Sequence, residues 1–148
     1  MTRTTIRNAV MALAFSATGG NVAFAQTPGT LEVVVTTPRN SQGHVGCALF
    51  SSNVGFPTQI ERAKIQRHKT QDRVVCSFAN LGPGRYAVAV VHDENNNGKL
   101  DTNMFGIPKE WWGTSNNVTH KLSAPTFEES VVVLSEGKPL TIAVKLHD

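Results

Sequence analysis

Apolar and polar residues alternate along short runs over most of the chain, which is the spacing of half-buried β-strands. The first runs are residues 31–38 (LEVVVTTP) and 44–52 (HVGCALFSS), separated by the turn-forming RNSQG. A third, residues 73–81 (RVVCSFANL), meets the turn chemistry of LGPG. The chain closes with residues 130–146 (SVVVLSEGKPLTIAVKL), which we predict to be two strands joined by a turn. The pattern predicts an all-β chain.

The run RYAVAVVH at residues 85–92 differs because both of its faces are largely apolar. Period-two alternation places Tyr86, Val88, Val90 and His92 on one face, with Ala and Val on the other. A strand that is apolar on both faces belongs in the middle of a sheet packed on another sheet. We therefore predict a single-domain antiparallel β-sandwich of about seven strands, with residues 85–92 at its centre.

Two segments lack a clear period. Residues 58–69 match either a short helix or an edge strand. Residues 102–126 are rich in Gly, Pro and Asn, and long loops of this kind in compact domains are usually functional or disordered. This one carries four large apolar side chains: Phe105, Ile107, Trp111 and Trp112. We therefore predict one long, ordered loop.

The first segment has the features of an export signal. Arg3 and Arg7 precede the short apolar run AVMALAF, and the A-x-A pattern AFA ends at Ala25. A membrane anchor is the alternative, but the apolar run is too short to span a bilayer, and no later stretch is longer. We predict a cleaved signal peptide over residues 1–25 and a β-sandwich domain over residues 26–148, in the periplasm or secreted and not membrane-spanning after cleavage.

Charge argues against a nucleic-acid partner. The chain has 14 Lys and Arg against 11 Asp and Glu, but two of the basic residues lie in the signal segment. Removing that segment leaves 12 against 11, a net charge of +1. The basic cluster at residues 62–73 is interleaved with Glu61 and Asp72, as on a solvated face rather than an anion-binding patch.

The two cysteines predict a disulfide, because exported chains meet oxidising conditions. Cys47 and Cys76 each lie on the apolar face of a strand, so both thiols point toward the core. We expect a bond that joins neighbouring strands. The alternative is two buried free thiols, and a catalytic thiol is disfavoured because no His is placed locally to lower the pKa of either thiol.

The candidate site is the segment HDENNNGKLD, residues 92–101. Oxygen-bearing side chains alternate at Asp93, Asn95 and Asn97, and Asp101 follows at position 9 of the loop. Such spacing is typical of loops that bind a hard cation, with a Gly at position 6 and a backbone carbonyl, here that of Lys99, at position 7. Position 12, where an EF-hand has Glu, is Met, and no flanking helices are evident.

We expect Glu110 to return from the following segment as the missing bidentate ligand. Amide and carbonyl oxygens favour calcium over magnesium, with weak affinity, on the order of 10⁻⁴–10⁻³ M, because carboxylates are few. The alternative is a metal-free turn in which Asn side chains bond to the backbone. No organic cofactor is expected.

His92, Trp111 and Trp112 adjoin this loop and are candidate ligand-binding residues. His92 either works with nearby carboxylates as acid and base, or packs beneath the loop against a carbonyl. The adjacent Trp side chains face opposite ways in an extended chain, so one enters the core and the other is left to stack on a sugar or peptide, or to pack. No G-x-S-x-G, H-E-x-x-H or phosphate-cradling loop is present, which disfavours an enzyme and leaves the question open.

Residues 81–127 resemble an exported bacterial family catalogued as domain of unknown function 2141. The family pairs an LPxGxYA-type turn with HDxNxNGxLD, then FGxPxEGxGxSN, then a Pro-Phe segment; here these are LGPGRYA, HDENNNGKLD, FGIPKEWWGTSN and APTF. The chain departs at Gly82, where Pro is usual, and at Trp111, where Gly is frequent. The resemblance implies an envelope location and a sandwich fold, but no activity. By analogy of the LGPGRY segment, the sandwich is immunoglobulin-like or transthyretin-like.

These observations favour a secreted or periplasmic binding or interaction module with a calcium-stabilised loop. An envelope protein, a peptide or a glycan is the expected class of partner. The alternatives are an envelope hydrolase that uses His92 and nearby carboxylates, and a metal-free structural protein of the envelope.

Overall fold

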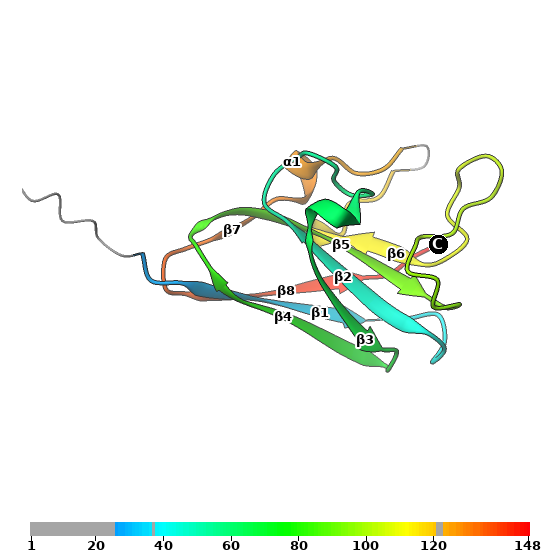
Figure 1. Ribbon diagram of the computed structural model, residues 1–148, viewed down its shortest axis with the longest axis horizontal. Coiled ribbons are helices and arrows are strands. Elements are labelled where there is room, and N and C mark those ends of the chain that lie inside the picture. Colours follow the sequence, from blue (N-terminus) through cyan, green and yellow to red (C-terminus); the bar gives the residue numbers. More distant parts are fainter. Residues whose placement is uncertain (1–25, 37, 121–122) are drawn as a thin grey trace, which may run out of the picture.

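The computed structural model describes residues 26–36, 38–120 and 123–148, and the predicted signal peptide lies outside them. Two sheets face each other, as predicted for a β-sandwich (Figure 1). The three-stranded sheet has the order β4-β1-β8: β4 (Arg73–Leu81), β1 (Gly29–Thr36) and β8 (Pro139–Lys145). The second sheet contains β3 (Lys64–Lys69), β2 (His44–Phe50), β5 (Gly84–Asp93) and β6 (Trp112–Thr114), and β7 (Val132–Leu134) also pairs with β5.

Strand pairing differs from the prediction at the two ends of the chain. β1 and β8 run parallel, with Val33 opposite Ile142, so the sandwich is not wholly antiparallel. The two final strands do not pair with each other, because β7 joins β5 and β8 joins β1. The turn between them therefore crosses from one sheet to the other.

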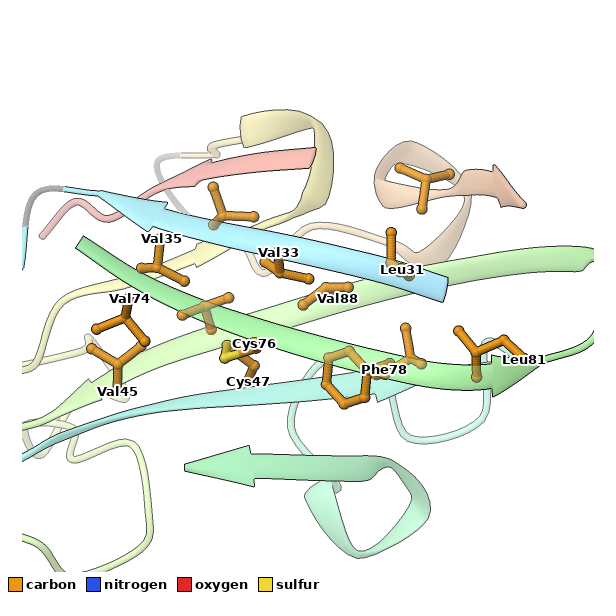
Figure 2. Close-up of a cluster of buried hydrophobic side chains, with 14 of the residues drawn as sticks. Leu31, Val33, Val35, Val45, Cys47, Val74, Cys76, Phe78, Leu81 and Val88 are labelled. Carbon is orange, nitrogen blue, oxygen red and sulfur yellow. A yellow bond between two sulfur atoms is a disulfide. The ribbon is translucent and has the colours of Figure 1, made fainter. Parts of the chain in front are cut away.

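Apolar side chains fill the space between the sheets. Leu31 and Val33 of β1 and Val88 of β5 are fully buried and face one another across the sandwich (Figure 2). Burial of a side chain of this size contributes roughly 1.5–3 kcal/mol, which makes this cluster the main source of stability. Val88 and Val90 of β5 both lie in this core, so the face of the central strand that carries them points inward.

The predicted disulfide is present between Cys47 and Cys76, with 6.5 Å between their Cα atoms. Both residues are fully buried within the core (Figure 2). The expectation that the bond joins neighbouring strands was wrong, because β2 and β4 belong to different sheets. Inward-facing residues of two packed sheets point at each other, so the bond closes the sandwich across its core.

A second, smaller apolar cluster covers the outer face of β5. Ala87 and Ala89 are buried there beneath Phe127, which opens the one-turn helix α1 (Phe127–Ser130). Phe56 packs edge-on against Phe127, with ring centroids 5.9 Å apart. The small Ala side chains on this face leave room for the covering rings, and β5 is buried on both faces as predicted.

The ambiguous segments contain short elements. Residues 58–69 hold the 3-10 helix η1 (Ile60–Arg62) and then β3 as an edge strand. Strand β6 and the 3-10 helix η2 (Ser115–Asn117) lie within the predicted long loop. With β6, the described residues contain eight strands, against about seven predicted. Among the described residues, no helix is long and apolar enough to span a membrane.

Candidate functional site

The candidate loop begins where β5 ends. Asp93 is the last residue of the strand and is only 7% exposed. Its Oδ1 accepts the N–H of Asn97 at 3.0 Å and its Oδ2 accepts that of Gly98 at 2.7 Å. Gly98 has φ +79°, a backbone conformation that is disfavoured for residues with a Cβ atom. One buried carboxylate therefore fixes the first turn of the loop.

Two asparagines form the next turns of the loop, because each side chain accepts the backbone N–H of the residue two positions later. The Oδ1 atom of Asn95 accepts the N–H of Asn97 at 3.1 Å, and that of Asn97 accepts the N–H of Lys99 at 2.8 Å. Their Nδ2 groups donate to the two carboxylate oxygens of Asp101, at 2.6 and 2.8 Å. The alternating side chains therefore converge on Asp101.

Glu110 joins the two ends of the loop. Its side chain returns from the following segment and the residue is 5% exposed. Oε1 accepts the N–H of Glu94 and Oε2 accepts the N–H of Asp101, each at 3.0 Å. A carboxylate that accepts a hydrogen bond from each end holds the loop closed.

The predicted ligand residues thus lie in one hydrogen-bonded network: Asp93, Asn95, Asn97, Lys99, Asp101 and Glu110. Glu94 points away from it and pairs with Arg39 and with the Nδ2 of Asn40. Met104, at position 12, is 89% exposed and supplies no oxygen. In the described part of the chain, no group of three or more His, Cys, Asp or Glu side chains is placed to hold a metal ion. A cation here would depend on amide and backbone oxygens as well as carboxylates.

The charges of the loop are unusual for their burial. Asp93 and Glu110 are both nearly buried, yet within the described ranges neither forms an ion pair with a Lys, Arg or His. Their only described partners are backbone N–H groups. Buried charges are normally paired with an opposite charge or bound to a metal, whereas these two carboxylates are held by hydrogen bonds alone.

His92 lies beneath the loop, fully buried. Its Nε2 donates to the carbonyl oxygen of Gln42 at 2.8 Å, and its Nδ1 has no described partner. A general base must reach the proton that it abstracts. An enclosed ring whose Nε2 is bonded to the backbone has no such access, which argues against the hydrolase alternative.

The two tryptophans face different surroundings. Trp111 packs against the main core, and its carbonyl accepts the N–H of His92 at 2.8 Å. The Trp112 ring lies edge-on against His147, with centroids 4.4 Å apart, in an open hollow also lined by Thr119 and His120. The structure therefore does not bring Trp112 together with the polar loop network.

Asn103 organises the segment beyond the loop, a role that was not predicted from the sequence. Its Oδ1 accepts the N–H of both Phe105 and Ile107, at 2.9 and 3.1 Å. A backbone bridge between Thr102 and Pro108 closes the same segment. We call residues 102–108 the finger. An Asn followed three residues later by Gly is the turn signal that would have identified it.

A family model described as an uncharacterized protein conserved in bacteria (DUF2141) matches residues 33–143. That range includes most of the strands and the whole loop network. No curated protein and no solved structure matches the chain.

Proposed function

The chain belongs to this bacterial family, DUF2141, and we propose that it is an exported binding module whose loop from Asp93 to Asp101 is stabilised by calcium. The Cys47–Cys76 disulfide fits a protein outside the cytoplasm. We propose the periplasm or the extracellular space as its compartment. The family itself carries no described activity.

The observation that carries the calcium proposal is the pair of buried, unpaired carboxylates. Asp93 and Glu110 meet the same loop from its two ends, and Asp101 adds a third carboxylate held by the two asparagine amides. A divalent cation compensates such charge better than a single ammonium group would. Carboxylate, amide and carbonyl oxygens are the ligands that calcium takes in flexible, high-coordination sites.

The residues present fit a weak site. Asp93 and Asp101 would bind through carboxylates, Asn95 and Asn97 through amide oxygens, and Lys99 through its backbone carbonyl. Because Glu110 already accepts two backbone N–H groups, it would orient the loop or bind through its remaining lone pairs. With few charged ligands we expect a dissociation constant on the order of 10⁻⁴–10⁻³ M.

A metal-free turn is the second candidate, and a specific observation favours it. The described hydrogen bonds already give Asp93, Asp101 and Glu110 an N–H donor for each carboxylate oxygen. In that case the loop would be a rigid structural feature of an envelope protein. The two candidates differ in one measurable property, which is the response of stability to calcium.

The test compares melting temperatures in calcium and in chelator. With a dissociation constant near 10⁻⁴ M, roughly 10 mM calcium stabilises the folded state by about 2.7 kcal/mol. For a domain of this size that raises the melting temperature by several degrees. Asp93→Ala should abolish the rise, and Glu94→Ala, whose side chain points outward to Arg39, should keep it. Equal melting temperatures for the wild type under both conditions would leave the metal-free turn.

In this proposal, the stabilised loop holds the adjoining surface in place so that a partner in the envelope binds to it. The partner classes are an envelope protein, a peptide or a glycan. His92 has no role in catalysis here, because its ring is enclosed and bonded to the Gln42 carbonyl. Trp112 lies in an open hollow, where an aromatic ring is able to stack on a sugar or peptide.

A further inference from the structure

The finger, residues 102–108, carries three large apolar side chains that are exposed together. Met104 is 89% exposed, Phe105 79% and Ile107 59%. Single exposed apolar residues are normal on protein surfaces, whereas a contiguous group indicates an interaction site. The other large apolar residues exposed in the described ranges lie on separate elements: Val54, Ile65 and Val133.

Asn103 supplies partners within the finger for several of its backbone groups. Besides the two N–H groups bound by its side chain, its own N–H donates to the Ile107 carbonyl at 2.8 Å. Its carbonyl accepts the N–H of Gly106 at 3.0 Å. Backbone N–H groups that enter an apolar medium need internal partners, because that medium offers none. The N–H groups of Phe105, Gly106 and Ile107 already have them.

The shape and charge of the finger suit a soft, anionic surface. It stands clear of both sheets at the end of the sandwich where β5 ends (Figure 1). Lys99 and Lys109 are exposed at its base, and neither forms an ion pair within the described residues. The nearby carboxylates of Asp93 and Glu110 are buried, and the partly exposed carboxylate of Asp101 is held by the amides of Asn95 and Asn97. The exposed charged side chains next to the finger are therefore the two lysines. Basic side chains beside an apolar group attract anionic lipid headgroups.

We propose that the finger docks the protein on an anionic lipid bilayer. Met104, Phe105 and Ile107 enter the boundary between headgroups and acyl chains, while Lys99 and Lys109 lie at the level of the phosphates. A protein partner is less suited to this surface. A stable protein interface buries about 800 Å² on each side, whereas the apolar tip is small and is surrounded by a polar, Asn-rich loop. The proposal goes beyond the calcium-stabilised module and does not require calcium.

The experiment measures co-sedimentation with vesicles. The chain starting at Gln26 serves, since all eight described strands lie beyond that residue. Vesicles of phosphatidylcholine alone are compared with vesicles that also contain phosphatidylglycerol, with chelator throughout so that calcium does not bridge headgroups to acidic side chains. We expect binding to the anionic vesicles, weakened by salt.

The double variant Phe105→Ser/Ile107→Ser should lower the partition coefficient by about tenfold, because it removes two of the three inserting side chains. Val133→Ser is the matched control, being 64% exposed on β7, and should bind like the wild type. The proposal is overturned if the wild type does not prefer anionic vesicles, or if the double variant binds like the control. It is also overturned if the finger residues prove to mediate only self-association in the absence of vesicles.

Discussion

Two regions of this molecule are buried to a similar degree by opposite chemistry. Between the sheets, Leu31 and Val33 are fully buried among other apolar side chains. At the end of β5, Asp93 and Glu110 are 7% and 5% exposed, and their described contacts are hydrogen bonds to backbone N–H groups. The first region is stabilised by removing apolar area from water, which depends little on direction. The second depends on the placement of single oxygen atoms.

The difference predicts how each region responds to change. In the apolar core, the loss of unfolding free energy grows with the volume of the side chains removed, and it does not depend on which ions are present. A hydrogen-bonded carboxylate network responds to charge, to ions and to the loss of a single acceptor. Variants in the two regions should therefore differ in size of effect and in sensitivity to calcium.

Removal of the disulfide should give the largest effect. The bond closes a loop with a sequence separation of 29 residues, and Cys47→Ala/Cys76→Ala should cost about 3–4 kcal/mol of unfolding free energy on the chain-entropy account. Urea denaturation of the variant and of reduced wild type should show similar losses. The calcium-dependent difference in melting temperature should persist in the variant, and its disappearance would show that the two regions are not independent.

Glu110→Ala should have the next largest effect. It leaves the N–H groups of Glu94 and Asp101 without their acceptor, at a cost of about 1–3 kcal/mol. Glu136→Ala is the matched control, since Glu136 also accepts a backbone N–H, that of Thr27, but at an exposed position. Urea denaturation should find the control within about 0.5 kcal/mol of the wild type. If both variants lost the same unfolding free energy, the burial of Glu110 would not explain its effect on stability.

The smallest effect is expected at an exposed carboxylate, that of Glu129. Glu129 lies in a capping box with Thr126 at the start of α1. Hydrogen bonds from the Thr126 hydroxyl and the Thr126 N–H, with a smaller contribution from His120, lower the pKa of the Glu129 carboxyl from its ordinary value of 4.5. Because the folded-state pKa is the lower one, this contribution to stability is present above the ordinary value and is lost as the pH falls through the lowered one.

The carboxyl carbon of Glu129, followed by NMR during acid titration, should therefore report a pKa below 4.5. Thr126→Ala should move the pKa back toward that value. An unchanged pKa in this variant would show that the capping box does not hold the charge.

Much of the fold follows from local pattern. The alternation in residues 31–38 and the two apolar faces of residues 85–92 predicted the sheets, and the inward phase of Cys47 and Cys76 predicted the disulfide. Which strands pair is a property of the whole chain. The parallel pairing of β1 with β8 and the separation of β2 from β4 into two sheets depend on contacts distant in sequence, which period-two alternation does not encode.

The site divides along the same line. The turns at Asn95 and Asn97 are local, so the spacing of these side chains along the chain was sufficient to predict that they belong to one loop. The return of Glu110 and the enclosure of His92 by Gln42 depend on segments that meet only in the folded state. The turn at Asn103 is local as well, but it was not predicted. The segment around it has no periodicity, and Asn103 is one of several asparagines nearby, so no pattern marked it as the residue that makes the turn.

Calcium titration followed by ¹H–¹⁵N NMR distinguishes a calcium-stabilised loop from a metal-free one. We expect saturable shifts, with a dissociation constant on the order of 10⁻⁴–10⁻³ M. They should concentrate at the amides that contact the loop carboxylates: Glu94, Asn97, Gly98 and Asp101. The amides of β1 in the core should remain unmoved. An unchanged spectrum at about 10 mM calcium, far above the expected constant, or shifts that lie only outside the loop, would contradict a calcium-stabilised loop.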